Sequence, residues 1–72
     1  MTRKEIELAF RQMGDPGTFS VRLFLDNRTT VLAHEWDFVD EDHGLLRVES
    51  RGRQATIDVN RIVVIERVPP PS

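Results

Sequence analysis

Along residues 1–13, apolar residues recur at intervals of three and four, which indicates an amphipathic helix. The apolar stripe consists of Ile6, Ala9, Phe10 and Met13. Thr2 and Glu5 form a capping-box pattern before it, and residues 14–17 (Gly-Asp-Pro-Gly) break the chain after it. The pattern therefore predicts a helix over residues 3–13. A helix of this length is not stable alone, so we expect it to dock on the rest of the chain.

From residue 18 the hydrophobic period changes to two, which indicates β-strands separated by polar or glycine-containing turns. Five strands are expected, at residues 18–25, 29–39, 45–49, 54–59 and 62–68. The second strand is long, and its apolar parity changes along its length, which indicates a bulge or a sharp bend. We interpret residues 1–68 as one helix-plus-barrel domain and residues 69–72 (Pro-Pro-Pro-Ser) as a polyproline tail.

The last predicted strand begins with residues 62–65 (Ile-Val-Val-Ile), which are apolar on both faces. A strand at the end of a small sheet normally keeps one face and one edge in water. We therefore expect something to cover both faces of this strand. The candidates are the N-terminal helix, the far wall of a small barrel, and a neighbouring subunit.

The composition limits the possible classes of protein. Seventy-two residues make one domain near the lower limit for a self-sufficient core, and the absence of cysteine excludes disulfides and thiolate metal sites. Ten Lys and Arg against twelve Asp and Glu give a net charge of −2, which counts against a nucleic-acid binder unless a basic rim forms locally. No apolar run is long enough to span a membrane, and no signal peptide is apparent. We expect a cytoplasmic protein without membrane contact.

Nine of the ten cationic side chains are arginines, and four of them cluster late in the chain, at Arg47, Arg51, Arg53 and Arg61. We expect cross-strand ion pairs between these arginines and Glu49, Asp58 and Glu66. The sequence contains no supported Ser-His-Asp arrangement, no glycine-rich phosphate loop and no HExxH motif. We expect neither an enzyme nor a cofactor or metal site.

Three sequence features carry a family resemblance. Leu25 fits the start of a first motif, and residues 40–45 (Asp-Glu-Asp-His-Gly-Leu) fit its end, with Gly44 where the family has Asn. Residues 60–61 (Asn-Arg) provide a short polar pair between the last two strands. With the order of one helix and five strands, these features resemble the Sm-like family, including its bacterial Hfq-type members.

The resemblance implies an N-terminal α-helix followed by a five-stranded, strongly bent antiparallel small barrel of Sm-like or SH3-like type. It also implies a homo-oligomer, a hexamer or heptamer, in which the fourth strand of one subunit pairs with the fifth strand of the next. Such rings bind single-stranded RNA rich in uridine or adenine near their loops. Position by position, the implied RNA-binding residues are Asp40, His43, Asn60 and Arg61.

A second function from another class is an SH3-like protein-interaction module or a small structural subunit with no nucleic-acid role. Its interaction surface would use Phe24, Trp36 and Phe38. Trp36 is the only tryptophan, and it either anchors an interface or closes one end of the barrel as a partly buried residue. His34 lies on the same predicted strand face, where we expect a hydrogen-bonded structural role.

Overall fold

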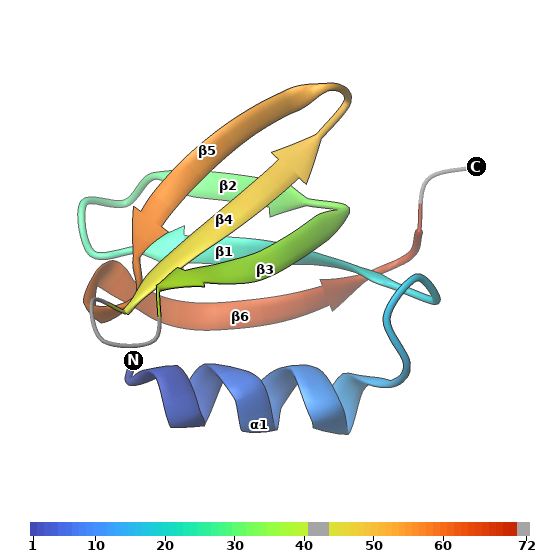
Figure 1. The fold of residues 1–72 in the computed structure, drawn as a ribbon, viewed down its shortest axis with the longest axis horizontal. Helices are drawn as coiled ribbons and strands as arrows, with labels where there is room; N and C mark the ends of the chain where they lie inside the picture. The colour runs from blue at the N-terminus through green and yellow to red at the C-terminus, as the bar shows by residue number, and fades with distance from the viewer. Residues whose placement is uncertain (41–43, 71–72) are drawn as a thin grey trace.

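The computed structural model describes residues 1–40 and 44–70, with only the backbone of Asp40, and shows a helix followed by six strands (Figure 1). Helix α1 spans Arg3–Met13. The strands are β1 (Ser20–Leu25), β2 (Thr30–Ala33), β3 (Glu35–Asp40), β4 (Leu45–Ser50), β5 (Arg53–Asp58) and β6 (Ile62–Val68). A short 3₁₀ turn, η1 (Val59–Arg61), connects β5 to β6.

The strands form two antiparallel three-stranded sheets, ordered β2-β1-β6 and β3-β4-β5. The predicted second strand runs through both sheets, because it bends at His34 between β2 and β3. At this bend the inward-facing set changes from Val31 and Ala33 to Trp36 and Phe38, whose cross-strand partners are core residues. The predicted change of parity is therefore confirmed, and its cause is the bend.

The prediction of a mainly β chain behind an N-terminal helix is confirmed, but the structure differs from a closed five-stranded barrel. The bend at His34 divides one predicted strand into two, which gives six strands. In the described part of the chain β5 and β6 do not pair with each other, so both sheets remain open. The physical reason is η1, which carries the chain directly from the second sheet to the first instead of making a hairpin turn.

The hydrophobic core lies between the two sheets and is closed by α1. Figure 1 shows the helix running beside β6, and Ile6 is the helix residue that the core buries completely. Burying a side chain of this size contributes roughly 1.5–3 kcal/mol, which is what holds a short helix in place. The buried apolar residues are Ile6, Phe19, Val21, Leu23, Leu25, Ala33, Leu46, Val48, Ile57, Val59 and Ile62.

Polar contacts hold both ends of α1. At its start, the Thr2 backbone N–H donates to Glu5 Oε1 at 2.9 Å, and the Glu5 N–H donates to Thr2 Oγ1 at 3.2 Å, so the predicted capping box is confirmed. At its end, Arg67 Nε on β6 donates to the carbonyl of Met13 at 2.9 Å. The helix is thereby fixed along β6.

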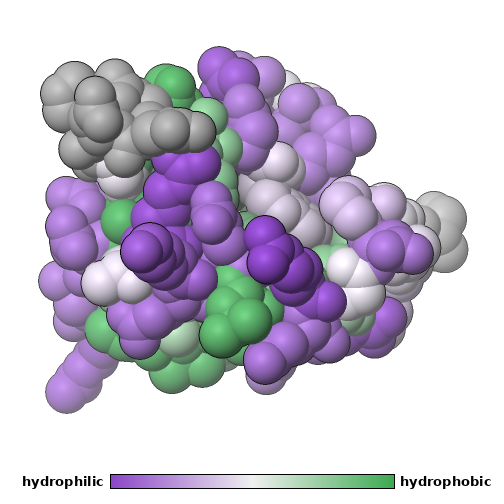
Figure 2. All heavy atoms as spheres, turned by 60° about the horizontal axis from the view of Figure 1, so that its bottom comes forward, coloured by the Kyte–Doolittle hydropathy of each residue, from purple (hydrophilic) through white to green (hydrophobic). Residues whose placement is uncertain are grey.

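Strand β6 contains the apolar segment 62–65, and the fold covers this strand on one side only. Ile62 is fully buried, whereas Val63 and Val64 are 52% and 51% exposed. The face of the molecule that carries α1 is largely hydrophilic, with hydrophobic areas of limited size (Figure 2). The helix therefore does not provide the two-sided cover that the sequence predicted for this strand.

The capping box gives a testable pH dependence. The hydrogen bond from the Thr2 backbone, together with the Thr2 side chain, holds the pKa of Glu5 below its ordinary value of 4.5. A carboxyl whose pKa is lowered by folding stabilises the protein above its unfolded pKa, and that contribution is lost as the pH falls through the folded pKa. We expect Glu5→Gln to reduce the loss of unfolding free energy below about pH 4.5. Urea titrations followed by circular dichroism on both sides of this pH measure the slope, and an unchanged slope would contradict the assignment.

Candidate functional site

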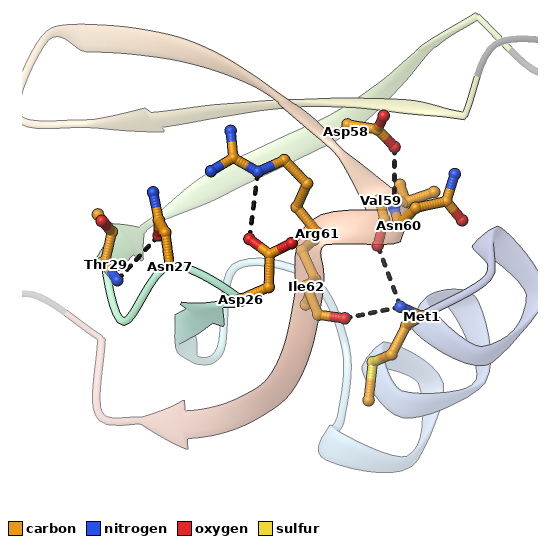
Figure 3. Close-up of polar contacts among 9 residues, drawn as sticks. All are labelled: Met1, Asp26, Asn27, Thr29, Asp58, Val59, Asn60, Arg61 and Ile62. Atoms are coloured by element: carbon orange, nitrogen blue, oxygen red, sulfur yellow. Dashed lines mark hydrogen bonds and ion pairs between the residues drawn. The ribbon is translucent and has the colours of Figure 1, made fainter.

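Two turns lie side by side at one end of the fold, the β1–β2 turn (residues 26–29) and η1 (Figure 3). The Asp26 N–H donates to the Arg61 carbonyl at 2.9 Å, and Arg61 Nε donates to Asp26 Oδ1 at 3.3 Å. Within η1, Asp58 Oδ1 accepts from the Asn60 N–H at 2.9 Å and so caps the turn. These bonds present Asn60 and Arg61 together at the surface.

The carbonyls of this region also bind the amino group of Met1. That group donates to the Val59 carbonyl at 3.2 Å and to the Ile62 carbonyl at 2.6 Å (Figure 3). The Val59 N–H in turn donates to the Gly44 carbonyl at 3.0 Å. A Cβ atom at residue 44 would lie only 3.1 Å from Cγ2 of Val59, at a backbone φ of +62°. The left-handed backbone and this close approach both favour glycine at residue 44.

The structure places part of the predicted RNA site at this end of the fold. Asn60 and Arg61 are adjacent and exposed on η1. Asp40 ends β3 and pairs with Leu45, which pairs with Asp58, so its backbone lies at the same end of the second sheet as η1. His43 lies outside the described residues. The fold thus brings the backbone of Asp40 towards the two residues of the turn.

The charges around η1 are balanced rather than strongly basic. The two turns carry Arg28 and Arg61 together with Asp26, and Asp58 directly precedes η1; of these, Arg61 and Asp26 form an ion pair. The side chains of Arg61 and Asp26 are 49% and 54% exposed, and an ion pair of that kind contributes only about 0.2–1 kcal/mol. Arg61 can therefore exchange Asp26 for another anion at little cost. The exposed Asn60 amide adds both a donor and an acceptor.

The predicted interaction residues do not form one surface. Trp36 and Phe38 face inwards from β3 and are partly buried against the core. The Trp36 ring lies 4.8 Å from the ring centre of Phe10 and 5.4 Å from that of Phe19. Phe24 pairs with exposed positions of β2 and β6 and lies on the outer face of β1. Trp36 is therefore a partly buried residue, as one of the two interpretations predicted.

The buried Ser20 and the half-buried His34 form a polar pair that the sequence did not reveal. Ser20 Oγ and His34 Nδ1 are 2.8 Å apart, and the His34 backbone N–H donates to the Glu49 carbonyl at 2.9 Å. His34 Nε2 is also buried, and it has no hydrogen-bond partner among the described residues. Because Ser20 has no exposed surface, its hydroxyl is not accessible to a substrate. The pair ties β1 to the bend, which confirms the structural role expected for His34.

The arginines pair with other carboxylates than those predicted. Arg47 makes two bonds to Asp37, of 3.1 and 2.7 Å, and this contact raises the pKa of Arg47. Asp37 lies directly opposite Arg47 in the β3–β4 register, so the bent strand supplies the partner instead of Glu49. Arg61 pairs with Asp26 because η1 and the β1–β2 turn are adjacent in the fold. No ion pair involves Arg51 or Arg53 within residues 1–40 and 44–70, contrary to the prediction.

No group of three or more His, Asp or Glu side chains among the described residues is placed to hold a metal ion. In the same part of the chain, no helix is long and apolar enough to cross a membrane. Comparisons with protein-family models, with curated proteins and with solved structures found no match to this chain. The proposed function therefore rests on the geometry described above.

The Ser20–His34 pair can be tested through stability. Ser20→Ala leaves a buried histidine nitrogen without its partner, which costs roughly 1–3 kcal/mol. We expect a corresponding decrease in the unfolding free energy, measured by urea denaturation. Ser50→Ala makes the same chemical change at a partly exposed serine of β4 and should cost about 0.5 kcal/mol or less. Equal effects of the two substitutions would show that the hydrogen bond does not hold the bend.

Proposed function

We propose that this chain is the subunit of an Sm-type ring of six or seven copies that binds single-stranded RNA through the end of the fold carrying η1. The observation that supports it best is that β5 and β6, which are consecutive in the chain, each have an unpaired edge in the described structure. β5 ends one sheet and β6 ends the other, and in the described structure each pairs on one side only. These strands correspond to the fourth and fifth strands of the family, because β2 and β3 together form its bent second strand.

Strand pairing between copies would use both edges. If β5 of one copy pairs antiparallel with β6 of the next, the two open sheets become one continuous six-stranded sheet. β6 presents the exposed apolar side chains of Val63 and Val64 near this edge, where soluble proteins usually place charges or proline. The interface joins two different edges, so repetition of the contact closes into a ring or extends as a filament. A domain of 72 residues also gains core size from such pairing.

RNA binding is proposed for η1 and the neighbouring turn. Arg61 offers a planar guanidinium suited to phosphate, and its present partner is a weak surface ion pair. Asn60 offers an exposed amide that can read the edge of an unstacked base. A ring would repeat this pair once per subunit around the axis. Many weak contacts to one strand would then add up, although the net charge of one subunit is −2.

A protein-interaction module is the second candidate, and one observation favours it. A groove of about 560 Å³ runs between α1 and β3, and the aromatic residues Phe10, Trp36 and Phe38 are among its lining residues. An apolar partner bound there would respond little to salt, whereas RNA affinity falls steeply as salt is added. The salt dependence of binding thus separates the two candidates.

The ring can be tested by charging the exposed edge of β6. We expect the unchanged protein to have a solution mass of about 50–58 kDa by size-exclusion chromatography with light scattering, six or seven times its 8.3 kDa. Val64→Lys places a charge on that edge and should give a monomer. Leu8→Lys, at a residue of α1 that is 54% exposed, is the matched control and should leave the mass unchanged. A monomeric unchanged protein would refute the ring.

The RNA site can be tested by removing Arg61. We expect Arg61→Ala to weaken binding of a fluorescent uridine oligonucleotide about tenfold and to reduce the slope of log K against log salt by about one. Arg47→Ala is the matched control, because Arg47 is similarly exposed and also ion-paired, but on the outer face of β4. If both variants bind like the unchanged protein, η1 is not the RNA site.

A further inference from the structure

A second hollow lies away from η1, between β2 and the far end of the β4–β5 hairpin. Figure 1 shows this hairpin rising away from β2 towards its tip. Between the hairpin and β2 lies a hollow of about 720 Å³ that is open to solvent. Its apolar lining residues are Val31, Leu32, Val48 and Ala55. The polar lining residues are Thr30, Ser50, Arg51, Arg53 and Gln54. The hollow exists because the second sheet is not closed onto the first.

Arg53 stands on the inner face of β5 at this hollow. Side chains alternate along a strand, so Arg53 shares a face with Ala55 and with Ile57, which is buried in the core. Glu49 pairs with Gln54 in the register and so lies on the opposite face of the hairpin. Within the described residues, no carboxylate forms an ion pair with Arg53. The hollow therefore carries an uncompensated positive charge beside an apolar wall.

The hairpin tip carries a second arginine at a position where arginine is unfavourable. Arg51 and Gly52 have φ values of 53° and 79°, as a two-residue type I′ turn requires. Asn, Asp or Gly is preferred at the first of these positions, because other side chains are strained in the left-handed region. Turn stability thus does not explain the choice of Arg51. Because Arg51 also lines a smaller hollow with Glu35 and Glu49, we assign the main charge of the site to Arg53.

We propose that this hollow binds one nucleotide unit, with its phosphate on Arg53 and its base against the half-buried Val31 and the exposed Ala55. Arginine binds phosphate through two parallel hydrogen bonds, and an unstacked base can pack against apolar as well as aromatic side chains. The Ser50 hydroxyl, whose residue pairs with Arg53 in the register, supplies a donor and an acceptor for a base edge. The unit is either a free mononucleotide or one residue of a single-stranded RNA. In the second case the inference rests on the proposed function and adds a contact to it.

The experiment uses amide chemical shifts of the ¹⁵N-labelled protein during titration with uridine monophosphate and adenosine monophosphate. We expect saturable shifts confined to residues 30–32 and 48–55, with Arg53→Gln weakening binding about tenfold. Arg47→Gln, which removes an exposed arginine from the other face of the hairpin, should bind like the unchanged protein. Absence of shifts in the hollow, or equal binding by Arg53→Gln, would overturn the inference. Inorganic phosphate binding as tightly as the nucleotides would overturn the role of the base.

Two further arms identify the source of the nucleotide and separate this site from η1. A uridine hexanucleotide that binds more tightly than the monophosphate, with the same residues shifting, supports an RNA strand as the source; equal affinities support a free nucleotide. The titrations are repeated on Val64→Lys and Arg61→Ala. Nucleotide shifts in the hollow that persist in both variants support the site even if the ring or the η1 contact fails. Oligonucleotide binding without shifts in residues 48–55 would overturn the site while leaving the proposed function intact.

Discussion

The bend at His34 is the constraint on which the rest of this fold depends. It divides one strand between two sheets, and it is held from both: the side chain bonds to Ser20 of β1, while the backbone N–H bonds to the carbonyl of Glu49 on β4. The reversal of parity at this point turns the apolar faces of both sheets towards one another. Without the bend, the residues of β3 would face solvent and α1 would have no core to cover.

The open sheets have a different cause, which is the connection between β5 and β6. The two sheets meet at the shared strand, and on the far side η1 passes from β5 to β6 without pairing them. The openness has two consequences in different places. It leaves β5 and β6 unpaired with each other in the described part of the chain, and it leaves the end of the β4–β5 hairpin standing apart from β2. The proposed assembly and the proposed nucleotide site therefore share one structural origin.

The distribution of arginines follows the strand registers. Arg22 and Arg47 pair with carboxylates directly opposite them on neighbouring strands, at 2.6 and 2.7 Å. The β4–β5 register ends at the hairpin tip, where Arg53 lies opposite Ser50 and Arg51 lies in the turn, so neither arginine has a carboxylate directly opposite it. A protein of net charge −2 can thus expose a local positive site. The net charge counted against an anionic ligand, but the local charge at each surface site depends on which arginines have a carboxylate partner.

The sequence by itself determined the helix, its capping box, the strand segments and the change of parity, because these depend on neighbours within a few residues. It also indicated Asn60 and Arg61 as a short polar break between the last two strands. Only the tertiary structure decided the partner of each arginine, the burial of Ser20 beside His34, the exposure of Val63 and Val64, and the open sheets. These features depend on contacts between residues far apart in the chain, such as Asp26 with Arg61, and local periodicity carries no information about which distant strands or turns meet.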